Sequence, residues 1–341
     1  MRGLFKLLLL LALIAGPIVA LSQFPRPRPV LAARQGPTIA DVKSWGYQLQ
    51  RVVPSTLPAS LDMMVVDYSR NGTEGRAWTP DEVEAMRRRA DGSRRIVLAY
   101  MSVGEAESYR FYWWPHWVSM PPSWMGPENP QWPGNFPVRF WHPSWSRSIV
   151  DPVPSTLERL VETRFSWRKP YLDRIIEAGF DGVYLDRVDV YEQWLKERPA
   201  ASDDMVTFVS TISRYAKSRR PGFLIVPQNA EELLNVKRYR EVIDAIAKED
   251  MFYGLGGNGV KNAEAEVTST RGLLDRLRAD QRPAFVVEYL DDAAKRAEAQ
   301  RRATSMGYVV NFTARGLNKA PQPIQPLPAD EQLLQSKRPV P

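Results

Sequence analysis

Short apolar runs alternate with helical patterns along most of the chain. Most of the runs consist of Val, Ile, Leu and Ala, which is typical of strands buried on both faces of a parallel sheet. Eight runs can be counted, at residues 45–49, 63–67, 96–101, 182–186, 223–226, 243–247, 285–288 and 308–312. Eight strands alternating with helices over roughly 280 residues match a closed (β/α)8 barrel. An open doubly wound sheet is the alternative, because periodicity does not reveal closure.

Helical signals between the runs support this α/β reading. At residues 79–82, Thr-Pro-Asp-Glu provides an N-cap, a proline in the first turn and the acid of a capping box. Farther along, Met205, Phe208, Val209 and Ile212 are spaced to form one apolar helix stripe. We therefore predict a single α/β domain of the TIM-barrel class, with a long Trp-rich loop after its third strand.

The ends of the chain differ from this central part. Residues 1–22 are typical of an export signal, with Arg2 and Lys6 before an apolar stretch. That stretch is shorter than the roughly 20 residues that span a bilayer, although an uncleaved anchor stays the alternative. We expect a Pro-rich linker at 23–40, the α/β domain at 41–318 and a Pro-rich tail at 319–341. The protein is therefore expected to be exported, to the periplasm or the extracellular space.

The charge balance argues against a nucleic-acid-binding protein. Lys and Arg number 46 against 39 Asp and Glu, but four basic residues and no acid precede residue 34, so the rest carries 42 − 39 = +3. So small an excess provides no basic stripe able to neutralise many phosphates. The chain has no cysteine, which excludes disulfides, thiolate metal sites and Cys nucleophiles. We expect no nucleic-acid partner, and a monomer.

Carboxylates gather where the predicted strands end. In a (β/α)8 barrel the active site lies at the C-terminal ends of the strands. A single acid there could simply cap the following helix, but a whole set favours a site. Massed carboxylates also raise one another's pKa, as a general acid requires. The acids at these ends are Asp67, Glu105, Asp186, Asp189, Glu249, Asp250 and Glu288.

The loop after the third predicted strand is unusually aromatic. Residues 109–145 contain seven of the eleven tryptophans of the chain. Aromatic faces suit the apolar faces of sugar rings and attract ammonium groups. Alternatively, most of these rings form a satellite hydrophobic cluster that holds the loop, and two or three line a cleft. The tryptophans are Trp113, Trp114, Trp117, Trp124, Trp132, Trp141 and Trp145.

Two other features resemble cofactor or metal-binding motifs but do not fit them. Residues 254–259 match G-x-G-x-x-G, but they follow the sixth strand and lack the acid that should end the next one, so we interpret them as a flexible loop. The only histidines, His116 and His142, have neither metal-ligand spacing nor the G-x-S-x-G motif of a serine hydrolase. We therefore predict no cofactor and no metal, while the many carboxylates leave an oxygen-ligand metal such as Ca²⁺ open.

Several sequence blocks together resemble glycoside hydrolase family 114, the endo-α-1,4-polygalactosaminidase group of (β/α)8 barrels. The blocks are Ala-Tyr-Met-Ser-Val-Gly-Glu-Ala-Glu at 99–107, Tyr-Arg-Phe-Tyr-Trp at 109–113, Trp-Pro-Gly-Asn at 132–135, Phe-Asp-Gly-Val-Tyr-Leu-Asp at 180–186, Pro-Gln-Asn-Ala-Glu-Glu-Leu at 227–233 and Glu-Asp-Met-Phe-Tyr at 249–253. The resemblance implies hydrolysis of an α-1,4-linked, galactosamine-rich polysaccharide by two carboxylates. By motif these are Asp186 and Glu249.

The mechanism that follows uses Asp186 as nucleophile and Glu249 as general acid/base, with retention or inversion left open. Arg187 should face away from Asp186 along an extended strand. The expected partner is a cationic polysaccharide. A non-catalytic polysaccharide-binding barrel is the main alternative, followed by a deacetylase or lyase on the same polymer. The predicted substrate contacts are Asp67, Tyr100, Glu105, Asp189, Gln228, Asn229, Glu288, Trp113 and Trp132.

Overall fold

The computed structural model describes residues 30–32, 36–150 and 169–321. The chain divides into two units, Met1–Leu31 and Ala32–Pro341, and the strands and helices named below all belong to the second. The predicted export signal, most of the predicted linker and residues 322–341 of the predicted tail lie outside the described residues. In the part of the chain that is described, no helix has both the length and the apolar character of a membrane span.

Eight parallel strands lie at the eight predicted positions, with bounds that differ from the prediction by up to three residues. The first five form one sheet in the order β1-β2-β3-β6-β7, and the last three form another in the order β10-β9-β8. The strands are β1 (Trp45–Tyr47), β2 (Met63–Asp67), β3 (Ile96–Ser102), β6 (Gly182–Asp186), β7 (Leu224–Pro227), β8 (Ile246–Glu249), β9 (Ala284–Glu288) and β10 (Val309–Phe312).

The two sheets are joined at both edges, although no strand ladder among the described residues closes the ring. Between β7 and β8, Gln228 forms a parallel bridge with Ala247, whose carbonyl also accepts from Asn229 N at 2.8 Å. Between β10 and β1, the Trp45 indole donates to the Val309 carbonyl at 3.0 Å. The strands therefore follow one another in the circular order of a (β/α)8 barrel.

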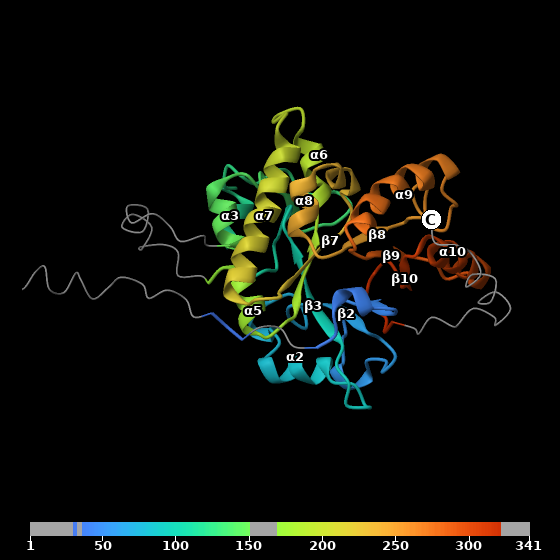
Figure 1. Cartoon of the computed structure of the whole chain (residues 1–341). Coiled ribbons are helices and arrows are strands. Elements are labelled where there is room, and N and C mark those ends of the chain that lie inside the picture. The colour runs from blue at the N-terminus through green and yellow to red at the C-terminus, as the bar shows by residue number, and fades with distance from the viewer. Residues whose placement is uncertain (1–29, 33–35, 151–168, 322–341) are drawn as a thin grey trace, which may run out of the picture. The chain divides into compact units, whose positions relative to one another are not determined.

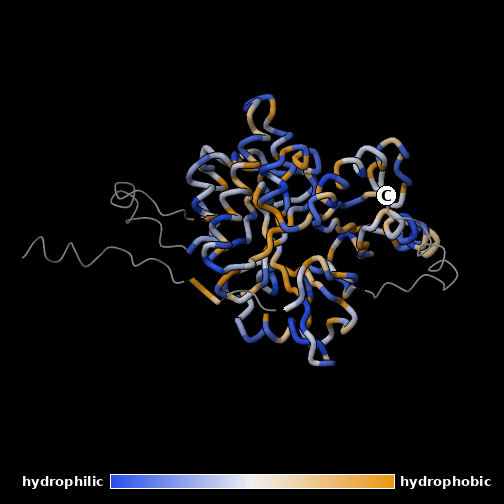
Figure 2. Tube along the Cα trace, in the orientation of Figure 1, coloured by the Kyte–Doolittle hydropathy of each residue, from blue (hydrophilic) through white to orange (hydrophobic). Residues whose placement is uncertain are grey.

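Side chains from both sheets pack into one interior core. The Trp45 ring lies 5.7 Å from the Phe285 ring, and the Tyr47 ring lies 5.0 Å from that of Tyr184. An open sheet would bury two separate faces, so this shared core identifies the barrel. Figure 2 shows the apolar residues concentrated along these central strands. The core includes Trp45, Tyr47, Met63, Val65, Ile96, Leu98, Tyr100, Tyr184, Leu224, Val226, Ala245, Ala247, Phe285 and Val287, with Val309 packed against it.

The helices lie around the outside of the strands (Figure 1). Helix α2 begins as predicted: the Thr79 hydroxyl accepts from Glu82 N at 3.4 Å, and Thr79 N donates to the Glu82 carboxylate at 3.0 Å. Helix α7 buries the predicted stripe from Met205 to Ile212. The α-helices are α2 (Pro80–Arg87), α3 (Pro143–Ile149), α5 (Tyr171–Glu177), α6 (Tyr191–Trp194), α7 (Ala201–Arg219), α8 (Lys237–Val242), α9 (Glu264–Ala279) and α10 (Ala293–Met306).

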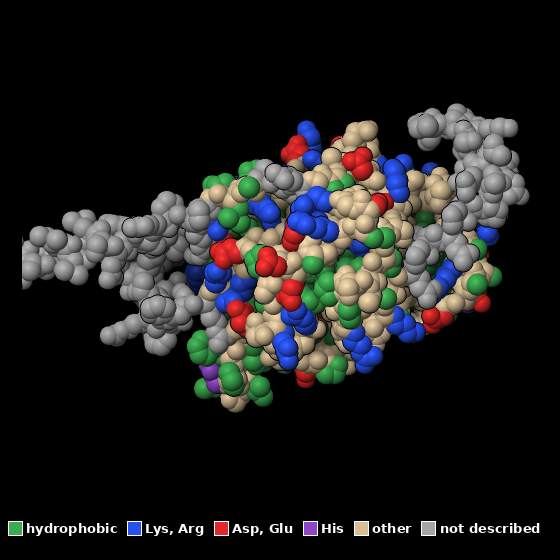
Figure 3. Space-filling model, turned by 90° about the horizontal axis from the view of Figure 1, so that it is seen from below, with side chains coloured by type: hydrophobic (Ala, Val, Ile, Leu, Met, Phe, Trp, Pro, Cys, Tyr) green, Lys and Arg blue, Asp and Glu red, His purple; other side chains and the backbone are tan. Residues whose placement is uncertain are grey.

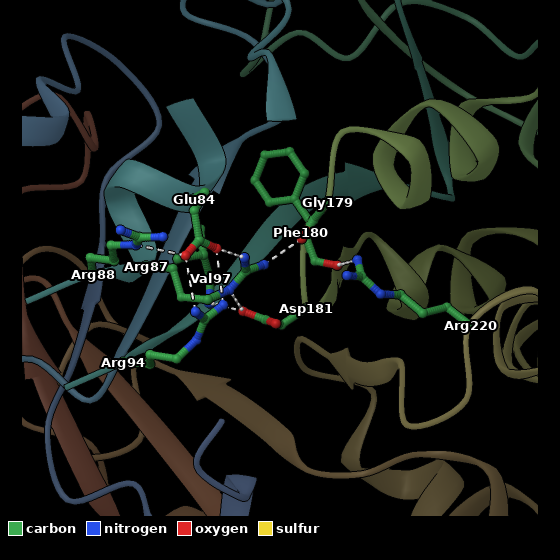
Figure 4. A network of polar contacts seen from close by, with 9 residues as sticks. All are labelled: Glu84, Arg87, Arg88, Arg94, Val97, Gly179, Phe180, Asp181 and Arg220. Atoms are coloured by element: carbon green, nitrogen blue, oxygen red, sulfur yellow. Dashed lines mark hydrogen bonds and ion pairs between the residues drawn. The ribbon is translucent and has the colours of Figure 1, made fainter. Parts of the chain in front are cut away.

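An arginine-carboxylate network joins α2 to the N-terminal ends of β3 and β6 (Figure 4). The buried Arg87 donates to Asp181 at 3.0 Å, and Asp181 also accepts from Val97 N at 2.9 Å. Glu84 accepts from Arg88 and from both Nη atoms of Arg94, each at 2.9 Å. Burial acts to raise the pKa of Glu84, but the bonds from Arg88, Arg87 and Arg94 lower it to about 2.

The aromatic loop after β3 contains a short antiparallel pair, β4 (Glu105–Glu107) with β5 (Asn135–Pro137), which the sequence analysis did not predict. Most of its rings form a hydrophobic cluster. Trp145 is fully buried, donates to the Val103 carbonyl at 2.9 Å, and packs 5.1 Å from the Trp124 ring. On the face shown in Figure 3, Lys and Arg are interspersed with Asp and Glu instead of forming a stripe of one sign.

Candidate active site

A cavity of about 720 Å³ lies at the C-terminal ends of the strands. Strand alternation explains which side chains reach it. Because successive side chains point to opposite faces, the residue two positions beyond an interior residue also points inward. Asp67, Asp186, Gln228 and Glu249 each follow an interior core residue by two positions, and all four line the cavity.

Asp186 ends β6 and accepts three hydrogen bonds. Tyr100 Oη donates to Oδ2 at 2.7 Å, while Gln228 Nε2 and the backbone N of Arg187 donate to Oδ1 at 2.9 and 2.8 Å. Burial raises the pKa of Asp186 to about 7, and the charge of Glu249 adds to that effect. The bond from Tyr100 acts in the opposite direction. Asp186 is thus held in a fixed orientation beside a second carboxylate.

Glu249 ends β8 and is held by neutral donors. The Tyr289 hydroxyl donates to Oε1, and Asn229 Nδ2 donates to Oε2 at 2.9 Å. The other end of the Asn229 amide accepts from Glu249 N at 3.0 Å, which fixes which way the amide points. Burial raises the pKa of Glu249, and the bonds from Tyr289 and Asn229 oppose that rise. Both carboxyl groups therefore hold protons more strongly than exposed ones do.

The chain turns sharply after each of these strands. Arg187, Asn229 and Asp250 have φ values of 60°, 58° and 52°, in the left-handed region that is uncommon for residues other than glycine. The expectation that Arg187 faces away from the site is wrong, because the strand has ended and alternation no longer applies. Its guanidinium lines the cavity and forms ion pairs with Glu105 at 3.1 Å and Asp189 at 3.4 Å.

The predicted carboxylates at the cavity wall have cationic partners. Asp67 pairs with the fully buried Arg110 at 2.8 Å. Glu105 accepts from Asn129 Nδ2 at 2.9 Å besides its ion pair with Arg187. These groups line the cavity with Asp189, and Glu105 and Asp189 share the single guanidinium of Arg187.

Arg110 itself was not among the predicted residues. It lies between Asp67 and Glu107, 2.6 Å from the latter, and its guanidinium lies 5.8 Å from the Tyr100 ring centroid and 4.9 Å from that of Tyr109. Its position beside two acids in the Glu-Ala-Glu and Tyr-Arg blocks was the available signal. Arg110 therefore supports the ring that donates to Asp186.

Two predicted contacts do not reach the cavity. Val287 faces the interior, so alternation places Glu288 on the outer side of β9, where it is fully buried and accepts from Phe252 N at 2.7 Å. Trp113 packs against the rings of Trp117 and Phe136, at 5.3 and 5.1 Å. Glu288 and Trp113 are therefore removed from the candidate substrate contacts.

The remaining predicted contacts, Tyr100, Gln228, Asn229 and Trp132, all line the cavity. Trp132 is 53% exposed, so its ring is available to a ligand. Tyr289 and Arg315 also line the cavity and were not among the predicted contacts. The lining includes the acids Asp67, Glu105, Glu107, Asp186, Asp189 and Glu249 and the bases Arg51, Arg70, Arg187 and Arg315, so its formal charge is 4 − 6 = −2. Among the described residues, no group of three or more His, Asp or Glu is arranged to hold a metal ion.

Comparisons with known proteins agree with this architecture. The sequence model of glycoside-hydrolase family GH114 matches residues 27–324. A protein of Deinococcus radiodurans is 33% identical over 335 residues, which are 94% of this chain and 98% of that protein. A protein of Methanocaldococcus jannaschii is 34% identical over 284 residues, covering 81% of this chain and 72% of that protein.

Among solved structures, the glycoside hydrolase domain of PelA from Pseudomonas aeruginosa superposes with a TM-score of 0.58 at 20% identity. The match covers 82% of this chain and 98% of that domain. At this identity the likeness concerns the fold.

Proposed function

The chain belongs to glycoside-hydrolase family GH114, and from that premise we propose that it cleaves an α-1,4-linked, galactosamine-rich polysaccharide with Asp186 and Glu249 as catalytic groups. The observation that carries the proposal is the shared cavity, in which both carboxyl groups have raised pKa values and the charge of Glu249 acts on Asp186. Glycosidic cleavage uses two such groups on either side of the scissile bond.

The surroundings of the two groups support different roles. Asp186 accepts three hydrogen bonds and lies near the charge of Arg187, which favour its ionised form. Burial favours the protonated form of both groups and is the largest effect on each, but Glu249 accepts two hydrogen bonds where Asp186 accepts three. Since the pair titrates together, near neutral pH it holds a proton, and we assign that proton to Glu249.

In the proposed first step, Glu249 gives its proton to the glycosidic oxygen while Asp186 bonds to the anomeric carbon and the glycosidic bond breaks. In the second, Glu249 takes a proton from water, whose oxygen bonds to the anomeric carbon as Asp186 leaves. The anomeric configuration of the product at the moment of its release tests this assignment. An inverted product would make Asp186 the base that activates water instead.

The cationic substrate is supported by the charge of the cavity. With Glu249 protonated, the lining has a formal charge of 4 − 5 = −1, which favours ammonium groups over acidic sugars. Trp132 and Tyr109 expose ring surface at its edge, which suits stacking of sugar rings. We further propose that the protein is exported, on the strength of residues 1–22.

The test is digestion of a partly deacetylated α-1,4-galactosamine polymer by the purified protein, with a neutral α-glucan as control and mass spectrometry of the fragments. Hydrolysis predicts shorter chains that gain one water at each cut. Products that lack this water and carry an unsaturated ring would identify a lyase. Release of acetate without shortening would identify a deacetylase, and binding without either change would identify a lectin-like barrel. Each of these three results contradicts the proposal.

A further inference from the structure

Arg315, in the loop after β10, uses its whole guanidinium to hold the loop after β8. Its Nη1 and Nη2 donate to the two carboxylate oxygens of Asp250 at 3.1 and 3.0 Å. Its Nε donates to Asn258 Oδ1 at 3.0 Å. Such a two-pronged pair fixes orientation as well as distance. Asp250 directly follows Glu249, so the clamp acts on the end of the strand that carries the proposed acid.

The same guanidinium packs on the ring that donates to Glu249. It lies 4.3 Å from the centroid of Tyr289. The Tyr289 hydroxyl in turn donates to Glu249 Oε1. A cation over a tyrosine ring is attracted to its face. Arg315 therefore touches both neighbours of Glu249, Asp250 through charge and Tyr289 through its ring.

The glycine-rich segment 254–259 makes room for this clamp. Gly254 has φ +122°, and a Cβ there would lie 2.3 Å from Asp250 Oδ1. Asn262 Nδ2 donates to the Asp250 carbonyl at 2.7 Å, and its Oδ1 accepts from Leu255 N at 3.0 Å. The motif thus serves the close approach of Asp250.

We infer that Arg315 is a positioning residue for the proposed general acid. It holds Tyr289 and Asp250 in place beside Glu249, and the positions of these two residues influence the pH range in which Glu249 is protonated. This inference rests on the proposed function.

The charges around Glu249 give the inference a direction. The ionisable groups facing it are Asp186 and Tyr184 from β6, Tyr47 from β1, Lys248 and Asp250 beside it on its own chain segment, Tyr289 after β9 and Arg315 after β10. Arg315 favours the ionised form of Glu249, whereas Asp250 opposes it. Arg315→Met and Asp250→Asn break the same ion pair, and they should shift the pKa of Glu249 in opposite directions.

The experiment measures kcat/KM against pH for wild type, Arg315→Met and Asp250→Asn. The alkaline limb reports loss of the proton from the general acid. We expect Arg315→Met to move this limb up by about 0.5 to 1 pH unit and Asp250→Asn to move it down by a similar amount. Arg315→Lys keeps the positive charge but loses the two-pronged pair with Asp250. It should therefore leave the alkaline limb near its wild-type position while lowering kcat. Arg271→Met, which breaks an Arg–Asp pair on α9, is the matched control and should leave the profile unchanged.

Loosening of the fold alone would lower activity in both variants without opposite shifts. Limbs that move in the same direction, or not at all, would overturn the inference while leaving the proposed function intact. The proposed function fails separately, if Glu249→Gln keeps wild-type activity. Should Arg315→Met not fold, Asp250→Asn and Arg315→Lys still carry the test.

Discussion

Tyr100 on β3 donates a hydrogen bond of 2.7 Å to Asp186 Oδ2 on the neighbouring strand β6. The two residues are not direct register partners, since Tyr100 pairs with Tyr184 and Ser102 with Asp186. The tyrosine side chain therefore reaches along the barrel toward the strand end, where its hydroxyl meets the carboxylate. This contact connects the interior core with the proposed nucleophile.

Replacing Tyr100 with Phe should weaken the ionised form of Asp186. Because the hydrogen bond lowers the pKa of Asp186, its loss should raise that pKa and move the acidic limb of kcat/KM to higher pH. A bond to a charged group corresponds to roughly a tenfold or larger loss of activity below neutral pH. Tyr239→Phe removes a buried hydroxyl with no hydrogen-bond partner among the described residues and is the control. An unmoved limb would contradict this role.

The two carboxyl groups should titrate as a coupled pair even without substrate. Glu249→Gln removes a negative charge that raises the pKa of Asp186, so that pKa should fall from about 7 toward its ordinary range. Carbon NMR of protein labelled at the Asp carboxyl carbon measures the change. Glu266→Gln, at an exposed site on α9, should leave the titration unaltered. If Asp186 titrates identically in Glu249→Gln, the two groups do not share a site.

Trp132 and Trp145 should respond differently to truncation. Trp132 is largely exposed at the cavity, so Trp132→Ala should raise KM while leaving the melting temperature nearly unchanged. Trp145 is fully buried, and Trp145→Ala should lower the free energy of unfolding by about 3 to 5 kcal/mol. Calorimetry and initial rates separate the two effects. A large loss of stability in Trp132→Ala would assign that ring to the hydrophobic cluster instead.

The network around Glu84 should stabilise the fold above acidic pH. Because the folded pKa of Glu84 is lowered from 4.5 to about 2, its contribution is present above pH 4.5 and is lost as pH falls through 2. Glu84→Gln should therefore lower the free energy of unfolding at pH 7 by up to about 3 kcal/mol. Denaturant titrations at several pH values should show this difference shrinking between pH 4.5 and pH 2. A pH-independent difference would mean that the charge of Glu84 is not what stabilises the fold.

The strand positions were predictable because buried parallel strands leave continuous apolar runs. Alternation along the same runs also separates the residues that face the barrel interior from those that face outward. Asp186 and Glu249 share the parity of inward-facing Tyr184 and Ala247, whereas Glu288 has the opposite parity to Val287. Tyr289 lies two positions after Val287, so alternation along β9 would have identified it as inward-facing. Glu288 was predicted wrongly because only its position at the strand end was considered.

Other parts of the site depend on contacts that no local pattern encodes. Arg187 enters the cavity because the chain turns left-handed directly after β6, and nothing in its neighbours specifies that turn. Arg315 reaches Asp250 across 65 positions of sequence, because β10 and β8 both pair with β9 in the same sheet. The resemblance of sequence blocks selected Asp186 and Glu249 among the many acids, which the residue pattern alone could not do.

The most direct test of the account is the rate at which Asp186→Asn and Glu249→Gln shorten a partly deacetylated α-1,4-galactosamine polymer that the wild-type protein cleaves. Circular dichroism establishes that each variant is folded, and Glu266→Gln serves as the isosteric control. We predict that each catalytic variant loses activity by at least about 10³-fold while the control keeps the wild-type rate. A folded Asp186→Asn or Glu249→Gln protein that shortens the polymer at the wild-type rate would contradict the account.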